Sequence, residues 1–176
     1  MTDASNPTEG ATSRARGLAS SLIGIDHIAV AVKDFEAAIR VWSDEFGFEL
    51  IQRTHISGES SGMYKAVLRA GALTLVLVQG DSSDSHISRY VEEHGPGVMH
   101  VAVQVQDQEQ VLDSFRAHGT KPLTGIVHAP GLDQAFLPRE PHSGIQLELV
   151  SRTGLNGFDN ASSLQLHEAM EGRTTS

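Results

Sequence analysis

The 176-residue sequence contains no cysteine. This absence excludes disulfide bonds, thiolate metal sites and cysteine nucleophiles, so a metal ion could be held only by histidine and carboxylate side chains. A chain without cysteine also suits a reducing compartment, and we expect a cytoplasmic protein.

Basic residues and long hydrophobic runs are scarce as well. The 13 lysines and arginines are scattered and are outnumbered by 22 acidic residues, for a net charge of −9. Nucleic-acid binding needs a concentrated basic surface, so we expect no nucleic-acid partner. No apolar run approaches the roughly 20 residues of a membrane-spanning helix, so we expect no membrane segment. Length and composition fit one globular domain.

Residues 1–22 are rich in Ser, Thr, Ala and Gly and contain no hydrophobic stretch. They are interpreted as a disordered N-terminal tail in preference to a secretory signal, with a mitochondrial presequence as the alternative. The predicted domain covers residues 23–152. Residues 153–176 are assigned to a C-terminal helix and tail.

The first part of the domain alternates between strand and helix patterns. Residues 25–32 predict a strand, and apolar residues at helical spacing predict a helix over about 34–46, with Asp34 as its N-cap and Gly47 as its stop. Two further strands are expected near 64–69 and 73–79. A Gly/Ser-rich loop over 57–62 precedes them.

The same order then repeats along the chain. Residues 27–36 match residues 100–109 with an offset of 73, and residues 72–78 match residues 144–150 with an offset of 72. Asp107 and Gln110 form a capping-box pattern for the second helix, which Gly119 ends. The sequence therefore predicts an α+β fold of two tandem βαβββ modules, 23–80 and 97–152, around a shared cavity. A short helix at 85–94 is expected to join them.

The repeat brings His27 and His100 to equivalent positions, each on a strand face with small neighbours. Glu148 lies in the middle of an apolar strand, where burying a carboxylate is costly unless it is paired. Taken singly, such residues are more often structural or solvent-facing. Together they predict a divalent metal site with two imidazoles and one carboxylate, the facial set that leaves three positions open on Fe(II). Val76 stands where the repeat would place a fourth ligand.

The seven other histidines fall in predicted loops or at helix ends and are assigned to solvent: His55, His86, His94, His118, His128, His142 and His167.

A duplicated βαβββ unit with a strand histidine in each half resembles the vicinal oxygen chelate superfamily, which includes glyoxalase I, methylmalonyl-CoA epimerase and several dioxygenases. The resemblance covers about residues 24–171. The stretch 85–152, with the run from His94 to His100, is similar to methylmalonyl-CoA epimerase. Where that family has a fourth ligand and a glutamate base, this sequence has Val76 and Ser60, with Glu59 beside the latter.

The C-terminal part looks more like 4-hydroxyphenylpyruvate dioxygenase and hydroxymandelate synthase. Residues 148–154, then Phe158 and the segment from Asn160 to Glu171, resemble that family's iron-binding glutamate and gating helix. Gln134 resembles a glutamine that lines its substrate pocket. That family joins two duplicated domains, whereas this sequence has one.

The leading interpretation is a non-haem Fe(II)-dependent dioxygenase that uses dioxygen and a small chelating acid of the 2-oxo acid type, such as 4-hydroxyphenylpyruvate. Gln134 and Gln104 would orient the substrate, and Thr74, Val76 and Val78 would form the apolar wall. One alternative is an epimerase or lyase using Co²⁺, Zn²⁺, Ni²⁺ or Mn²⁺. Another is a ligand-sequestering protein of the bleomycin-resistance type. The modules could assemble within one chain or exchange in a homodimer.

Overall fold

Eight strands form one mixed sheet in the computed structural model, which describes residues 21–129, 131–153 and 160–171. The elements follow one another as β1 (Leu22–Ala31), α2 (Phe35–Arg40), η1 (Val41–Glu45), β2 (Glu49–Ser57), β3 (Gly62–Ala70), β4 (Leu73–Gly80), α3 (His86–His94), β5 (Gly97–Val105), α4 (Gln108–Ala117), β6 (Val127–Ala129), β7 (Leu132–Phe136), β8 (Leu147–Arg152) and α5 (Asn160–Glu171).

The strand order β2-β3-β4-β1-β5-β8-β7-β6 reads the same from its centre outward in both modules. β1 and β5 pair antiparallel in the middle, while β1–β4 and β5–β8 are the parallel pairs. The central register joins His27 to Ala102, Ile28 to Val101 and Ala29 to His100. Residues 27, 28 and 29 of β1 correspond to residues 100, 101 and 102 of β5 in the repeat, so exchanging the two modules leaves these three pairs unchanged. A pseudo-two-fold axis therefore passes between Ile28 and Val101. The α+β fold with two tandem modules is confirmed.

The predicted helix caps are present. The side chain of Asp34 accepts a hydrogen bond from the backbone N–H of Ala37 at 2.9 Å, and Asp107 accepts one from Gln110 at 3.0 Å. The helix expected over 34–46 continues from α2 into one turn of π-helix, η1. Gly47 then ends it with a φ of 73°, a conformation that glycine adopts without steric cost.

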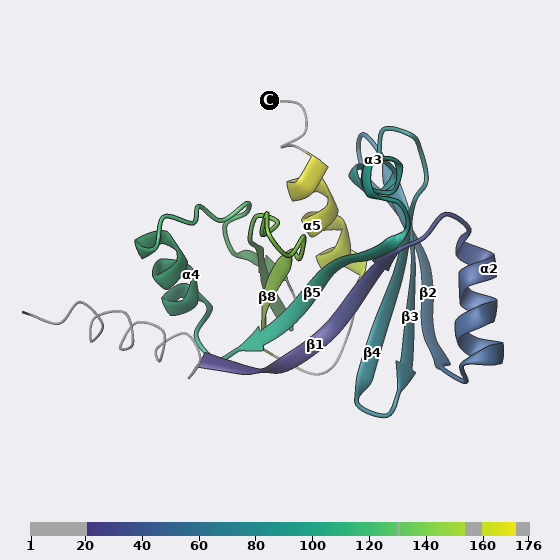
Figure 1. Ribbon diagram of the computed structural model, residues 1–176, viewed down its shortest axis with the longest axis horizontal. Coiled ribbons are helices and arrows are strands. Elements are labelled where there is room, and N and C mark those ends of the chain that lie inside the picture. Colours follow the sequence, from purple (N-terminus) through teal and green to yellow (C-terminus); the bar gives the residue numbers. More distant parts are fainter. Residues whose placement is uncertain (1–20, 130, 154–159, 172–176) are drawn as a thin grey trace, which may run out of the picture.

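Side-chain alternation gives the sheet a helix-covered outer face and a concave inner face (Figure 1). α2 packs Phe35 against Leu68 and Leu77 on the outer face of the first module. α4 packs Leu112 against Leu149 on the outer face of the second. The neighbouring residues of the same strands point inward, which leaves the concave face available for a site.

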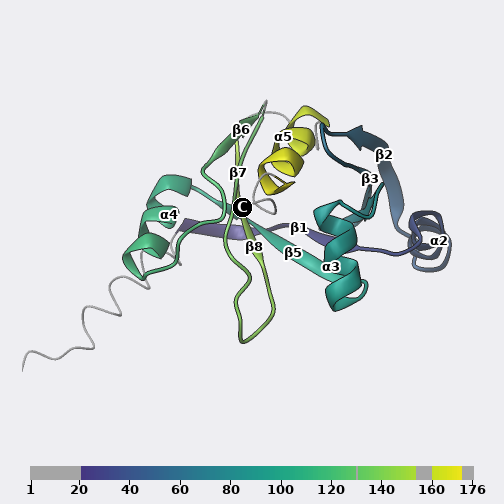
Figure 2. The ribbon, with the colours of Figure 1, turned by 90° about the horizontal axis from the view of Figure 1, so that it is seen from above.

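α5 crosses the opening of the curled sheet. It contacts β2 and β6, the two edge strands, and Figure 2 shows it between the two ends of the sheet. Its bounds agree with the predicted segment 160–171. Phe158, expected to belong to this closing segment, and residues 1–20 of the expected tail lie outside the described residues. The expected tail ran to residue 22, whereas Leu22 already belongs to β1. Within the described ranges, no helix has the length and apolar character needed to cross a membrane.

Sequence patterns assign no residue range to three of the strands, β2, β6 and β7. β2 is an edge strand whose side chains are mostly exposed, with Ile56 buried, so it lacks the apolar alternation that marks a half-buried strand. β6 has only three residues. Both edge strands are defined by their partners more than by their own sequence.

Gly80, the last residue of β4, offers a test of the packing that leads into α3. A Cβ there would lie 2.6 Å from Oγ and 2.7 Å from Cβ of Ser85, the buried residue that caps α3. Gly80→Ala should therefore lower the free energy of unfolding by about 1–3 kcal/mol in urea titrations. Gly97→Ala is the control, because a Cβ on this first residue of β5 meets nothing within 4 Å. Equal stability of the two variants would contradict the packing described.

Candidate functional site

Three polar side chains from neighbouring strands converge on the concave face: His27 from β1, His100 from β5 and Glu148 from β8. Oε2 of Glu148 lies 3.3 Å from Nε2 of His27 and 3.1 Å from Nε2 of His100. Glu148 is only 1% exposed. The structure thus brings together all three residues that the sequence predicted as metal ligands.

The strand register explains why the site has three such residues and not four. β1 pairs Ala29 with Val76 on β4, and β5 pairs Ala102 with Glu148 on β8. These pairs occupy equivalent places in the two modules, so Val76 lies where a fourth ligand would come from. Val76 is buried and lines the cavity with an apolar surface.

The donor set fits a divalent metal ion. Oε1 of Glu148 is buried and has no hydrogen-bond partner among the described residues, which is costly for a carboxylate unless a cation completes the site. One ligand atom from each of His27, His100 and Glu148 lies within 4.8 Å of the others. Two imidazoles and a carboxylate suit Fe²⁺, and also Mn²⁺, Co²⁺, Ni²⁺ or Zn²⁺.

Asp26 and Arg152 form a chain of polar contacts to Nδ1 of His27, the ring nitrogen that does not face Glu148. Oδ1 of Asp26 lies 2.9 Å from Nδ1 of His27, and Arg152 donates to Oδ2 through Nε at 2.7 Å and to Oδ1 through Nη2 at 2.8 Å. This contact fixes the ring so that Nε2 faces Glu148, as the outer-shell carboxylates of metal-binding histidines do. No local sequence pattern predicts the Arg152 contact, because it spans 126 residues.

Electrostatics set the charges of the site. Burial alone would lower the pKa of His27, but hydrogen bonds with Asp26 and Glu148 outweigh it and raise that pKa to about 9. Burial would likewise raise the pKa of Glu148, yet the two histidines lower it to about 2. Burial lowers the pKa of His100, opposed by its bond to Glu148. Near neutral pH, His27 therefore carries protons on both ring nitrogens in the metal-free protein. A divalent cation would replace the proton on Nε2.

A cavity opens from these three residues toward α3 and α5, with a volume of about 80 Å³. Its apolar wall comprises Ala29, Met63, Val76, Val78, Ile87, Met99, Leu132, Phe136 and Met170. Its other polar lining residues are Lys65, His86, Gln134, Gln146, Ser163 and His167.

Gln134 and Lys65 occupy equivalent positions in the two modules. Gln134 pairs with Val150 across β7–β8, and Lys65 pairs with Val78 across β3–β4. Both line the cavity and both are buried. Nζ of Lys65 donates to Oγ of Ser163 on α5 at 2.6 Å. Sequence reasoning placed Gln134 at the site but missed Lys65, whose signal was a single lysine inside a predicted strand.

Two other expected lining residues lie elsewhere, which corrects the prediction. Gln104 shares a strand face with His100, but it is four residues further along β5, about 13 Å at the usual rise per residue. With Thr74 it lines a separate depression beside Asp26 and Arg152. A shared face does not imply a shared cavity, because a nine-residue strand is longer than the site.

The assignment of seven histidines to solvent is wrong for two of them. His86 and His167 line the cavity, and His167 is only 3% exposed. The packing of α3 and α5 over the concave face buries them, and this packing is not visible in the local sequence. The other five are exposed, as expected: His55, His94, His118, His128 and His142.

Comparison with known proteins places this geometry in a family. The family model for the glyoxalase/bleomycin resistance protein/dioxygenase superfamily matches residues 26–137. The chain belongs to this superfamily. The match includes His27 and His100, and the structural likenesses described next extend over more of the chain.

Among curated relatives, 3-dehydroshikimate dehydratase of Pseudomonas aeruginosa is 31% identical over 110 residues, which are 62% of this chain and 16% of that protein. An uncharacterised Synechocystis protein is 26% identical over 110 residues, 61% of this chain and 31% of its own. The chain thus spans less than a third of either relative. The Bacillus subtilis protein YqjC is 26% identical over 141 residues, 74% of this chain and 93% of its own.

Solved structures share the fold. A mutant of 4-hydroxymandelate synthase from Streptomyces coelicolor matches with a TM-score of 0.75 and 21% identity, covering 85% of this chain and 54% of that one. Methylmalonyl-CoA epimerase from Mycobacterium tuberculosis matches with a TM-score of 0.65 and 23% identity, covering 76% and 90%. The Streptomyces coelicolor epimerase in complex with 2-nitronate-propionyl-CoA gives a TM-score of 0.65 and 27% identity, covering 76% and 100%.

We expect His100→Ala and Glu148→Ala to remain folded and to lose stoichiometric binding of Fe²⁺ or Mn²⁺, because each removes one of three ligands. Metal content after dialysis, measured beside circular dichroism, checks this. Gln104→Ala is the matched control on β5 and should bind metal like the wild type. Full metal occupancy in both ligand variants would refute the site.

Asp26→Asn should weaken metal binding about 10- to 100-fold without changing its stoichiometry, since it disturbs the residue that orients His27. Titration against a competing chelator measures the dissociation constant. Asp133→Asn is the control: Oδ1 of Asp133 lies 2.9 Å from Nδ1 of His128, an exposed histidine, and neither residue lines the cavity. If both variants weaken binding equally, Asp26 has no special role.

Proposed function

We propose that the protein is a non-haem Fe(II)-dependent dioxygenase acting on a small chelating acid of the 2-oxo acid type, for example 4-hydroxyphenylpyruvate. The observation that carries the proposal is the set of three ligands, His27, His100 and Glu148, with the apolar Val76 in the fourth position. When bound there, Fe²⁺ would supply open coordination positions for a bidentate acid and for dioxygen.

Two buried side chains of the cavity suit the binding of such an acid. Lys65 provides a positive charge that favours an anion in a wall of low polarity, and Gln134 provides an amide that can donate to or accept from an oxygen of the substrate. They come from equivalent strands of opposite modules. An acid held between them would have its position and its orientation fixed.

α5 serves to exclude water from the reaction. Ser163, His167 and Met170 of this helix line the cavity. Its last residue, Glu171, accepts hydrogen bonds from the backbone of His86 at 2.7 Å and from Arg89 at 3.1 Å, which fastens the helix to α3. A closed, dry site limits side reactions of reactive oxygen chemistry.

The epimerase alternative finds less support in the cavity. Glu59 and Ser60, at the place of the epimerase base, are exposed and absent from the described cavity lining. Glu148 is the only carboxylate among the described lining residues. We place the reaction in the cytoplasm, consistent with a chain without cysteine.

The test is an anaerobically prepared, Fe²⁺-loaded protein supplied with oxygen and a panel of 2-oxo acids. Carbon dioxide release should equal oxygen consumption for at least one acid, and His100→Ala should reduce turnover by more than about 100-fold because it removes a ligand. Gln104→Ala should retain turnover. Oxygen-independent proton exchange on methylmalonyl-CoA, without coupling for any acid, would favour the epimerase. Ligand binding that survives in His100→Ala without turnover would favour sequestration.

A further inference from the structure

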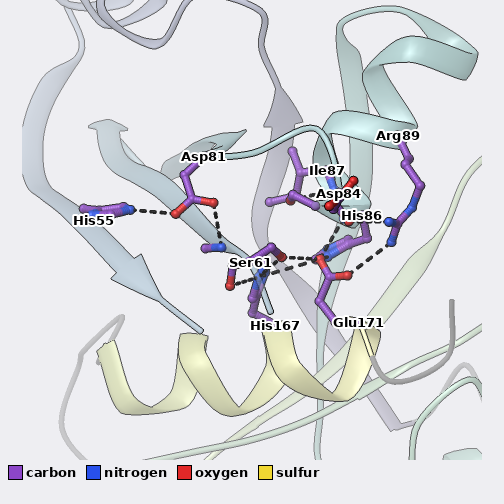
Figure 3. A network of polar contacts seen from close by, with 11 residues as sticks. His55, Ser61, Asp81, Asp84, His86, Ile87, Arg89, His167 and Glu171 are labelled. Atoms are coloured by element: carbon purple, nitrogen blue, oxygen red, sulfur yellow. Dashed lines mark hydrogen bonds and ion pairs between the residues drawn. The ribbon is translucent and has the colours of Figure 1, made fainter. Parts of the chain in front are cut away.

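A polar cluster joins α3, α5 and the loop before β3 on the helical side of the cavity, facing the sheet that carries His27, His100 and Glu148 (Figure 3). Its centre is Glu171. Oε1 of this residue accepts from Oγ of Ser61 at 2.8 Å and from the backbone N–H of His86 at 2.7 Å, and Oε2 accepts from Arg89. Two members of the cluster, His86 and His167, also line the cavity.

The contacts of His86 fix which of its nitrogens carries the proton. Its Nδ1 lies 3.0 Å from Oε1 of Glu171. Burial alone would raise the pKa of Glu171, but the hydrogen bonds of Ser61 and His86 lower it to about 2, so the carboxylate is ionised and can only accept. Burial is the main cause that lowers the pKa of His86 to about 4, so the ring is neutral. Nδ1 therefore donates, and Nε2 holds a lone pair.

The contacts of His167 lead to the same result on its other nitrogen. Nε2 lies 3.1 Å from the carbonyl oxygen of Ser61 and 3.2 Å from its Oγ. The Ser61 hydroxyl gives its own proton to Glu171, so both oxygens accept from Nε2 of His167. In the neutral ring, Nδ1 is then the nitrogen that holds the lone pair. It is buried and has no hydrogen-bond partner among the described residues.

The helical wall thus presents two imidazole acceptors whose ring centroids are 5.0 Å apart. A buried acceptor without a donor is unfavourable, which points to a donor arriving with a ligand. A second metal ion suits this cluster less well, although His86, His167 and Glu171 are close enough to hold one. Both oxygens of Glu171 are already used, and the guanidinium of Arg89 would repel another cation.

We propose that His86 and His167 form the specificity wall of the cavity and accept a hydrogen bond from a hydroxyl or amino group at the substrate end remote from the metal ligands. The inference rests on the proposed function, since it takes the cavity as the site of an acid anchored at His27, His100 and Glu148. It adds that the acid carries a donor group at its other end, and that acids lacking this group bind less well.

A matched pair of acids that differ by one hydroxyl group tests the proposal: 4-hydroxyphenylpyruvate and phenylpyruvate, titrated without oxygen into the Fe²⁺-loaded protein. The wild type should bind the hydroxylated acid about 3- to 10-fold more tightly, the usual worth of one hydrogen bond to a neutral partner. At least one of His86→Leu and His167→Leu should bring this ratio close to one, because one hydroxyl donates one hydrogen bond, and both should leave phenylpyruvate affinity within about twofold; a wild-type ratio in both variants would overturn the proposal. Unchanged phenylpyruvate affinity also shows that the cavity is intact.

His55→Leu is the matched control, because His55 also contacts a carboxylate, Asp81, but is exposed and is not a lining residue. It should keep the wild-type ratio. A wild-type ratio of one, with both acids still dependent on His100, would overturn the specificity wall and leave the proposed function standing. Binding of neither acid would overturn both, and a second metal ion bound by His86 and His167 would overturn the inference.

Discussion

The antiparallel pairing of β1 with β5 is the constraint on which the site depends. It places the pseudo-two-fold axis between Ile28 and Val101, and therefore places His27 and His100 on either side of that axis, on the same face. Each central strand then pairs in parallel with the last strand of its own module, which brings Glu148 beside both histidines. Neither module alone contains the set of three ligands. The site exists only where the two meet.

The two modules share a backbone arrangement but differ in the side chains that face the cavity. Val76 and Glu148 occupy equivalent positions, and so do Lys65 and Gln134, yet each pair combines residues of different character. The proposed metal ligands therefore lie asymmetrically in a nearly symmetric sheet, and the first module contributes a mostly apolar wall to the cavity. Because helices cover the outer face of each module, changes on the inner face need not disturb the outer cores.

Residues tied to the repeat could be predicted from the sequence, whereas residues brought in by long-range packing could not. His27, His100 and Glu148 followed from the offsets of 73 and 72, and Asp34 and Asp107 followed from local capping patterns. Gln104 was misplaced, because strand periodicity defines a face and not a distance along it.

His86, His167 and Lys65 were missed for a related reason. Their burial is created when α3 and α5 pack over the sheet, through contacts such as Ser61–Glu171 that span 110 residues. β2 was missed because an edge strand with exposed side chains has no apolar alternation to detect. Local patterns thus identified the residues that the sheet contributes to the cavity, but not those that α3 and α5 contribute by packing over it.

We propose that one metal ion binds where β1, β5 and β8 meet. Anomalous diffraction from crystals of the protein grown with Fe²⁺ or Mn²⁺ tests it most directly. We expect one strong peak within about 2.0–2.3 Å of Nε2 of His27, Nε2 of His100 and the carboxylate of Glu148. A peak elsewhere, or no peak at these three residues in crystals saturated with metal, would contradict it.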